Sequence, residues 1–391
     1  MVTYPSDWQE GTIGDLFNVS AGGDVKKRWF SRYRTQSHPY EIFSNGIENR
    51  GLYGYTSTAI YAGNAVTVTA RGTIGQAFYR ENDFDAIIRL LVLSPKNDNT
   101  KPKFYEYFIN SQVVFEKENT GVPQLTAPKI KEKTVPILSG EEQKAIIATL
   151  STFDTYIDDL AELIEKKRGI RDGALEDMIR HRTRIDGFND EWTTVSFNQV
   201  ITPKARIGWQ GLKKHEYLRS GYSYLIGGTD FSHGTVSLDN IWYVSKDRYD
   251  MDANIQVSEN DVLVTKDGTI GKVALVPELG KPATLNSGVF VFRTNNRLLP
   301  TFLFRILSSS VFREFIDTLS AGSTIKHLYQ KDLKNFEFEI PVDKKEQEAI
   351  ANTLTAMDEE VEALEIERAK MIQIREGAMD DLLTGRVRLS V

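Results

Sequence analysis

Glu142-Gln-Lys-Ala-Ile-Ile-Ala-Thr-Leu150 recurs as Glu346-Gln-Glu-Ala-Ile-Ala-Asn-Thr-Leu354, and the offset of 204 residues then holds without a gap to the end of the chain. Within this stretch Asp154 matches Asp358. Self-similarity at a fixed offset marks a repeated architecture. We therefore interpret the chain as two variable regions, each followed by one copy of a common helical segment.

Apolar residues in both copies of that segment fall at alternating steps of four and three. They are Ile146, Leu150, Phe153, Ile157 and Leu160 in the first copy and Ile350, Leu354, Met357, Val361 and Leu364 in the second. This spacing is the a/d pattern of a coiled coil. We predict two helices of about 40 residues that pack antiparallel, so that their length sets the distance between the variable regions. The alternative is two independent amphipathic helices, each docked on its own domain.

The variable regions predict an α+β fold, built twice. The expected organisation is a globular domain over 1–139, a helix over 140–187, a second domain over 188–343 and a second helix over 344–391. In each domain a strand, a Gly-Thr-Ile-Gly turn and a second strand follow one another, with the turns at Arg71–Gly75 and Asp267–Gly271. Each hairpin precedes a further strand (Ala86–Leu93, Gly288–Thr294) and a helix (Lys103–Glu118, Pro300–Thr318).

The composition is that of a globular protein, with 40% hydrophobic and 26% charged residues, which excludes a disordered chain. There is no cysteine, so disulfides, thiolate zinc sites and cysteine nucleophiles are excluded. We see no signal peptide and no apolar run of the roughly 18 residues that a membrane span needs. We expect a cytoplasmic protein with no membrane partner.

The net charge of −6 argues at first against a nucleic-acid partner. The acidic excess, however, falls mainly in the two helical segments, which leaves the globular regions near neutral with local basic clusters. The charge pattern therefore permits DNA binding without requiring it.

Motifs for catalysis are missing from the sequence. No G-x-G-x-x-G follows a predicted strand, and no two prolines are adjacent, which excludes the Asn/Asp-Pro-Pro-aromatic tetrapeptide of DNA amino-methyltransferases. Gly268-Thr-Ile-Gly-Lys272 lacks the spacing and the Ser/Thr of a phosphate loop. The five histidines show no metal-ligand spacing. We predict that the chain has no catalytic residues, no metal and no cofactor of its own.

Basic residues interleaved with aromatic ones form the first candidate for DNA binding. In the first region they are Lys26, Lys27, Arg28, Arg32 and Arg34, and at a similar early place in the second they are Lys204, Arg206, Gln210, Lys213 and Lys214. Such clusters contact phosphates and can reach base edges. The alternative is a solvated loop with incidental charge.

Two further candidates are the segment before each long helix and the residue before each Gly-Thr-Ile-Gly turn. The segments contribute Gln124 and Lys129 in the first region and Thr324, Lys326, His327 and Tyr329 in the second, and the turns contribute Arg71 and Lys266. Short polar side chains with flanking lysines suit phosphate contacts. Capped loops and ordinary hairpins would explain the same residues.

This ordered set of features resembles the specificity subunits of Type I restriction–modification systems over essentially the whole chain. The resemblance rests on the Glu142-Gln143 and Glu346-Gln347 helix starts, the 379–386 stretch and the two Gly-Thr-Ile-Gly hairpins. It rests also on the apolar a/d residues of both helices, which we call the seam. It implies two target-recognition domains held apart by an antiparallel coiled coil, each reading half of a bipartite, interrupted site in double-stranded DNA. Because Gly121–Leu125 departs from Gly322–Leu328, DNA contacts cannot be transferred residue by residue.

The same resemblance implies the partners. Two modification subunits would bind S-adenosylmethionine and methylate adenine, and restriction subunits with motor and nuclease activity would cleave unmodified DNA. Two other functions remain open: the recognition subunit of a Type IIB-like restriction system, and a coiled-coil scaffold that binds proteins instead of DNA. Salt-sensitive, sequence-dependent affinity for duplex DNA would separate the scaffold from the other two.

Overall fold

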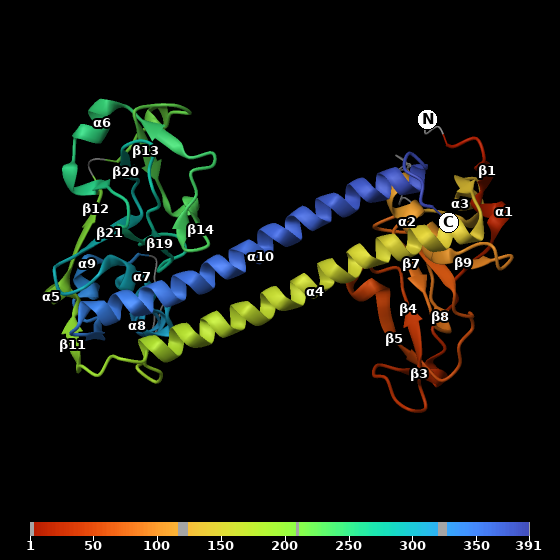
Figure 1. Cartoon of the computed structure of the whole chain (residues 1–391), viewed down its shortest axis with the longest axis horizontal. Helices are drawn as coiled ribbons and strands as arrows, with labels where there is room; N and C mark the ends of the chain where they lie inside the picture. The colour runs from red at the N-terminus through yellow and green to blue at the C-terminus, as the bar shows by residue number, and fades with distance from the viewer. Residues whose placement is uncertain (1–3, 116–123, 209–210, 320–326, 391) are drawn as a thin grey trace. The chain divides into compact units, whose positions relative to one another are not determined.

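The computed structural model describes residues 4–115, 124–208, 211–319 and 327–390 and has the predicted α+β class, with long helices and mostly antiparallel sheets (Figure 1). The chain divides into two compact units. Unit 1 comprises Met1–Glu162 and Glu365–Val391, and unit 2 comprises Leu163–Leu364. Each unit therefore holds one globular region, the first part of the long helix that follows it, and the last part of the other long helix.

The two long helices have the predicted length: α4 runs over Gly140–Ile179 with 40 residues and α10 over Lys344–Thr384 with 41. Both end before the limits we predicted, 187 and 391. His181 adopts a left-handed conformation at φ 58° just after α4, and Gly385 does so at φ 74° just after α10. A left-handed residue at this place terminates a helix because the next backbone N–H groups turn back to its last carbonyls.

Unit 1 contains three sheets, a two-stranded one of β1 and β10 and two four-stranded ones in the orders β2-β9-β6-β7 and β3-β5-β4-β8. The strand bounds are β1 Gln9–Thr12, β2 Phe17–Ala21, β3 Phe30–Ser31, β4 Tyr40–Phe43, β5 Leu52–Thr56, β6 Ala65–Thr69, β7 Ala77–Arg80, β8 Phe84–Ala86, β9 Leu90–Pro95 and β10 Thr134–Ile137. The short helices are α1 Ile13–Leu16, α2 Pro102–Gln112 and α3 Ala127–Lys131.

Unit 2 contains a two-stranded sheet of β11 and β22, a six-stranded sheet in the order β12-β21-β18-β19-β15-β14 and a four-stranded sheet in the order β16-β13-β20-β17. The strand bounds are β11 Trp192–Ser196, β12 Ile201–Ala205, β13 Ser223–Ile226, β14 Phe231–Ser232, β15 Thr235–Val236, β16 Trp242–Val244, β17 Gln256–Val257, β18 Val262–Thr265, β19 Val273–Leu275, β20 Ala283–Leu285, β21 Val289–Thr294 and β22 Glu337–Pro341. The helices are α5 Phe197–Val200, α6 Lys246–Asp250, α7 Pro300–Ser308, α8 Ser310–Leu319 and α9 Gln330–Leu333.

The strand registers give a residue-by-residue match between the two globular regions. Val68 faces Ala77 across the β6–β7 hairpin, and Val264 faces Val273 across the β18–β19 hairpin. Strands β2 and β9 of unit 1 pair as β12 and β21 do in unit 2. Counting from these pairs identifies which residue of one region occupies the position of a given residue in the other.

Two predicted elements are each divided in the structure. The strand expected over Ala86–Leu93 is the end of β8 and the start of β9, because Leu90 N–H donates back to Ile87 C=O at 3.0 Å and forms a turn between them. The helix expected over Pro300–Thr318 is α7 and α8, separated by the extended residue Ser309.

The helix expected over Lys103–Glu118 also differs from the structure. Helix α2 ends at Gln112, where Val113 becomes extended with φ −93° and ψ 118°. An extended residue cannot continue the helical hydrogen-bond pattern, so the helix stops there. Residues 116–118 of the prediction lie outside the described residues.

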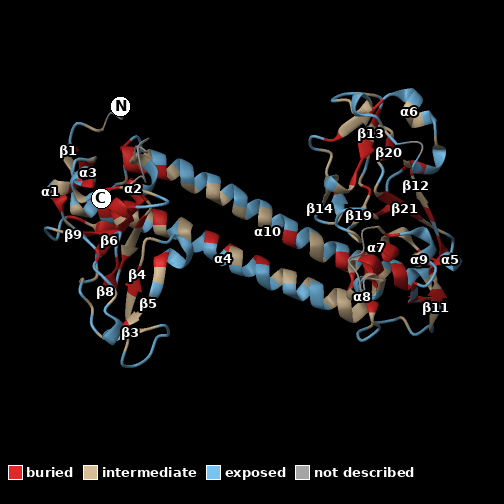
Figure 2. Cartoon of the chain, turned by 180° about the vertical axis from the view of Figure 1, so that it is seen from behind, coloured by how far each residue is buried: buried red, intermediate tan, exposed pale blue. Residues whose placement is uncertain are grey.

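The predicted seam residues are buried or half-buried along both long helices (Figure 2). Those nearest the helix starts belong to the globular cores: Ile146 and Leu150 pack in the core of unit 1, and Ile350 and Leu354 in that of unit 2. Farther along, Ile157, Leu160 and Val361 are buried, and Phe153, Met357 and Leu364 are half-buried. Fully burying one such aliphatic side chain stabilises a fold by about 1.5–3 kcal/mol, so the cores hold the helix starts firmly.

The recurring Glu-Gln pair at each helix start is buried, and its glutamine joins the helix to the globular region. Gln143 accepts a hydrogen bond from the Lys101 backbone N–H at 2.8 Å, and its amide donates to two backbone carbonyls. Gln347 makes the corresponding contacts in unit 2 and accepts from the Leu299 N–H at 2.9 Å. Buried side-chain amides need such partners. A glutamine therefore has the same role in the first turn of both helices.

The glutamate of the pair in unit 1, Glu142, connects the first residues of that unit to its last ones. The Trp8 indole N–H donates to Glu142 at 3.1 Å, and the Arg388 guanidinium donates two hydrogen bonds to it at 2.5 and 3.0 Å. Arg388 also contacts both carboxylate oxygens of Asp7 at 2.9 Å. These hydrogen bonds and the Arg388 charge hold the pKa of Asp7 below its usual range.

Glu346 accepts matching hydrogen bonds in unit 2. There its partners, Arg184 and Trp192, lie close together in one stretch of the chain. Arg184 donates two hydrogen bonds to its carboxylate, both at 2.8 Å, and the Trp192 indole donates a third at 3.3 Å. Arg184 also donates to the Asp190 backbone carbonyl. Paired charge-assisted hydrogen bonds of this kind are stronger than neutral ones, so they hold the turn after α4 against the start of α10.

Candidate nucleic-acid interface

The predicted strand–turn–strand units are confirmed and have matching geometry. In unit 1 the turn needs glycine because Gly72 and Gly75 have φ values of 75° and 90°, which other residues rarely adopt. The hydroxyl of Thr69, at the end of β6, donates to the Thr73 carbonyl at 2.5 Å across the turn. The Thr265 hydroxyl donates to the Thr269 carbonyl in the same way. The two turns therefore have the same hydrogen-bonded geometry.

The segment before each short helix α3 or α9 lies against its turn. In unit 1, Arg71 and Gln124 form an isolated β-bridge. In unit 2, Asp267 and His327 form the corresponding bridge, and the Leu328 backbone N–H donates to the Lys266 carbonyl at 2.8 Å. Two candidate groups that are far apart in sequence are therefore neighbours in both units.

Around this bridge, unit 1 presents an amide between two arginines. The Arg89 guanidinium donates to the Gln124 side-chain oxygen at 2.7 Å. Arg71 is exposed, and its backbone N–H donates a hydrogen bond to the Asn45 side-chain oxygen at 3.3 Å. Arginine and glutamine side chains are the residue types that contact guanine and adenine edges. Arg89 was missed by sequence reasoning because it stands alone in an apolar run.

Unit 2 has different chemistry at the same place. The His327 ring hydrogen-bonds the Asp267 carboxylate and lies 4.5 Å from the Tyr329 ring, centroid to centroid. The ammonium of Lys331 lies 5.3 Å from the Tyr329 ring, and that of Lys266 lies 5.5 Å from the Phe290 ring. The predicted contacts Thr324 and Lys326 lie outside the described residues.

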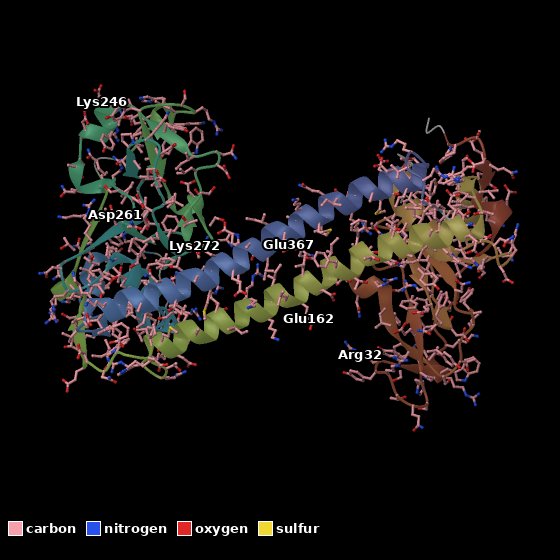
Figure 3. The ribbon with its side chains drawn as sticks, in the orientation of Figure 1. Arg32, Glu162, Lys246, Asp261, Lys272 and Glu367 are labelled. Atoms are coloured by element: carbon pink, nitrogen blue, oxygen red, sulfur yellow. The ribbon has the colours of Figure 1, made fainter. Side chains whose placement is uncertain are left out.

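The basic cluster of the first region is a surface loop between β2 and β4. All five of its cations are exposed: Lys26, Lys27, Arg28, Arg32 and Arg34. The Lys26 ammonium lies 5.1 Å from the Trp29 ring, and Arg32, beside β3, can be followed in Figure 3. Among the described residues, none of the five lies within salt-bridge distance of a carboxylate. Unpaired, exposed cations are available to a polyanion.

Backbone contacts link this loop to the turn. Gly23, just before the loop, forms a parallel bridge with Ile87, and the Ile88 backbone N–H donates to the Gly23 carbonyl at 2.9 Å. The next residue is Arg89, whose side chain contacts Gln124. The three candidate groups of unit 1 are therefore connected: the loop through Gly23 to the segment 87–89, and Arg89 through Gln124 to Arg71.

The prediction for the second basic cluster is wrong for Arg206. This residue is 3% exposed, and its Nε donates to the Leu285 carbonyl at 2.9 Å. Burial lowers the pKa of Arg206, and the nearby Arg248 charge lowers it further. Arg206 directly follows Ala205, which pairs with Phe290, and its side chain enters the space beside β20, so it is not presented on the surface of unit 2.

The other members of that cluster are distributed over a strand and a loop. Lys204 lies on β12 and is half-buried. Lys213 and Lys214 are exposed beyond the strand, and Gln210 lies outside the described residues. The predicted contact Lys129, which belongs to unit 1 and not to this cluster, is exposed on α3. The exposed cations of unit 2 in this region are thus fewer than those of the unit 1 loop.

The described residues lack a metal-ion cluster and a membrane-spanning helix. They contain no group of three or more histidine, aspartate or glutamate side chains placed to hold a metal ion. None of the helices in the described part of the chain has the length and apolar content that crossing a membrane requires.

Comparison with known proteins gives one consistent family. The family model described as "Type I restriction modification DNA specificity domain" matches residues 5–167 and 189–373. The Type I restriction enzyme MjaVIII specificity subunit of Methanocaldococcus jannaschii is 22% identical over 98% of this chain and 94% of its own length. The EcoBI specificity subunit of Escherichia coli is 22% identical over 69% of this chain and 64% of its own.

A solved structure with a similar fold is the Type I restriction–modification S subunit from M. genitalium. Its TM-score is 0.63 at 19% identity, with 96% of each chain covered. A chain from a study of complex assembly in the type I R-M system has a TM-score of 0.61 at 14% identity, with 98% of this chain and 100% of that chain covered. At these identities the likeness concerns the fold alone.

Proposed function

This chain belongs to the Type I restriction–modification specificity subunits, and we infer from the geometry of its surfaces that it is the non-catalytic subunit that reads double-stranded DNA. Each globular region would read one half of an interrupted, bipartite site. The observation that carries this proposal is the exposed cationic loop of unit 1, which adjoins the Arg71–Gln124 bridge. Phosphate contacts from the loop would position the duplex, and side chains at the bridge would contact base edges.

We further propose that α4 and α10 form an antiparallel coiled coil and that the chain is a duplication with the four segments predicted from sequence. In unit 1, the Arg375 guanidinium contacts Asp154 at 2.6 Å and the Tyr156 hydroxyl contacts Glu367 at 2.5 Å. The order of these contacts is antiparallel, because the later residue of α4 meets the earlier residue of α10.

Contacts between the same two helices in unit 2 support the proposal. Arg171 meets Asp358 at 2.9 Å, and Lys167 meets Glu360 at 2.5 Å, which is again the antiparallel order. The Arg171–Asp358 pair repeats the Asp154–Arg375 pair at an offset of 204 residues with the helices exchanged. A rigid helix pair would fix the gap between the two half-sites.

The proposed partners follow from the family. Two methyltransferase subunits would dock on this chain and supply S-adenosylmethionine and adenine methylation, and restriction subunits would join them. The chain itself would hold no cofactor and would act in the cytoplasm. A recognition subunit of a Type IIB-like system and a protein-binding scaffold are the alternatives, and only the scaffold lacks sequence-dependent affinity for DNA.

The test is the pattern of methylated bases in a host without other methylation. The chain is expressed with the methyltransferase from its gene neighbourhood, and modified bases are sequenced across the genome. We expect N6-methyladenine in a two-part motif with one fixed gap. The absence of any motif, with a soluble methyltransferase that binds S-adenosylmethionine, would favour the scaffold. A fused methyltransferase–nuclease as the only neighbour would favour the Type IIB-like system.

A further inference from the structure

A polar cavity of about 690 Å³ lies in unit 1, and none of its lining residues belongs to the loop or the bridge described above. Its walls come from β4, β7, the turn Glu48–Gly51, the start of α2 and one face of α4. A volume of this size is in the range that small-molecule sites occupy. Four cations line it against two carboxylates: Arg50, Arg80, Lys101 and Lys103, with Glu41 and Glu81.

Arg80 is the most deeply buried cation of this cavity. It is 4% exposed, its Nε donates to the Thr67 hydroxyl at 2.9 Å and its Nη2 donates to the Arg50 carbonyl at 2.7 Å. Its guanidinium lies 3.4 Å from the centre of the Phe43 ring. No carboxylate of the described residues lies within salt-bridge distance of it. Burial lowers its pKa to about 9, and an unpaired buried charge destabilises a fold.

Unit 2 shows that this position does not need an arginine. Tyr79 faces Val66 as Leu275 faces Val262, so the residue after Leu275, Val276, occupies the position of Arg80. Val276 is 1% exposed and packs in an apolar core. The same β-hairpin is therefore stable with an aliphatic side chain, and the buried guanidinium of unit 1 calls for another explanation.

The other cations of the cavity are also specific to unit 1. Helices α2 and α7 both begin with proline, and counting from it places Thr301 at the position of Lys103 and Leu299 at that of Lys101. The Lys103 ammonium contacts Glu106 at 2.6 Å. The start of α2 adds backbone N–H groups with a partial positive charge.

The turn Glu48–Gly51 beside the cavity holds its fourth cation, Arg50. Asn49 and Arg50 both have left-handed backbones, with φ values of 46° and 53°. Left-handed backbones are unfavourable for residues other than glycine and persist where the surroundings enforce them. Here they place the Arg50 guanidinium 2.9 Å from the Tyr79 carbonyl and 3.4 Å from Glu106. The Glu106 charge is thus shared by Arg50 and Lys103, while Arg80 feels the charges of Glu106 and Glu41 only from beyond salt-bridge distance.

We propose that this cavity binds a phosphate group, with Arg80 as the buried anchor and Arg50 and Lys103 at its rim. The planar guanidinium fork suits the geometry of phosphate oxygens. The phosphate belongs either to a free phosphorylated molecule or to a nucleic-acid backbone. This site would be distinct from DNA reading if the phosphate comes from a free molecule, because such binding does not depend on whether the chain binds DNA.

The experiment uses the full chain and two substitutions that install the residue of unit 2. These are Arg80→Val and Lys103→Thr, and Lys345→Thr, an exposed residue at the start of α10, is the control of equal charge change. Binding of inorganic phosphate is measured by calorimetry against chloride at equal ionic strength. Binding of a short duplex of arbitrary sequence is measured over a series of salt concentrations.

For a free ligand, we expect phosphate to bind the wild type and the control, and each cavity variant to weaken it at least about tenfold. For a backbone phosphate, inorganic phosphate fails to bind, and each cavity variant weakens duplex binding and lowers the salt slope by roughly 0.9. Lys103→Thr decides the matter if Arg80→Val does not fold, because Lys103 is only half-buried. Unchanged phosphate and duplex binding in the cavity variants would overturn the proposal and make Arg80 a structural tie.

Discussion

Units 1 and 2 protect the same sheet edge by different means. In unit 1 the outer strand β7 is covered by side chains: Asn110 accepts from the Ala77 backbone N–H at 2.8 Å and donates to the Ala77 carbonyl at 3.0 Å. In unit 2 the corresponding strand β19 pairs with β15, which in turn pairs with β14. An unprotected edge is a template for aggregation. The comparison shows that the β6–β7 and β18–β19 hairpins are alike, while the elements that cover their outer strands differ between the two units.

The contacts that anchor the long helices, in contrast, recur at matching positions in both units. Gln143 and Gln347 bind the backbone in the same way. The carboxylate of Asp154 receives hydrogen bonds from Arg375 and the Tyr107 hydroxyl, and that of Asp358 receives them from Arg171 and Arg305. Helix anchoring is therefore common to both units, and the surfaces proposed to read DNA are where they differ.

The largest expected difference concerns the buried glutamate of each helix start. Glu346→Ala should destabilise unit 2 by about 2 kcal/mol, because the buried carboxylate and the hydrogen bonds that it accepts from Arg184 and the Trp192 indole are lost. Glu142→Ala should cost less, because Arg388 keeps Asp7. Hydrogen exchange read separately in the two units measures both effects. The exposed Glu348→Ala is the control, and equal protection losses in the two units would contradict the comparison.

The second difference concerns affinity for duplex DNA. Replacing Lys26, Lys27 and Arg28 together by alanine should lower the slope of log K against log salt by roughly 2.7, since each phosphate contact contributes roughly 0.9. Replacing Lys213 and Lys214 should lower it by roughly 1.8. Fluorescence anisotropy titrations on one duplex over several salt concentrations give both slopes. An unchanged slope in the triple variant would remove the loop from the proposed interface.

The smallest expected difference lies at the sheet edge. Asn110→Ala should destabilise unit 1 by about 1 kcal/mol, because it removes two hydrogen bonds from the edge of β7. Ser308 occupies the matching position on α7, and its hydroxyl donates to the Phe304 carbonyl of its own helix. Ser308→Ala should therefore leave the exchange of β19 amides unchanged. Faster exchange of β19 in that variant would show that the added strands do not protect the edge.

Much of the fold could be predicted from the sequence, because its signals are local. The four-and-three spacing of apolar residues predicted both helices with nearly their observed lengths, and the Gly-Thr-Ile-Gly turns located both hairpins. The helix ends were missed because a left-handed His181 is a property of one residue's backbone and leaves no periodic signal. Within the candidate site, the five cations from Lys26 to Arg34 are exposed, as dense charge favours, and their role in DNA binding stays a prediction.

What only the tertiary structure decided is which charged residues face inward and which distant segments meet. Arg206 and the exposed Lys213 belong to one basic stretch of sequence, yet the register of β12 against β21 buries the first. Arg71 meets Gln124 through a bridge across more than fifty residues. The sequence by itself determined the repeat, the helices and the turns, because these depend on spacing along the chain. Burial and long-range pairing depend on how strands pack side by side, and that information exists only once the chain has folded.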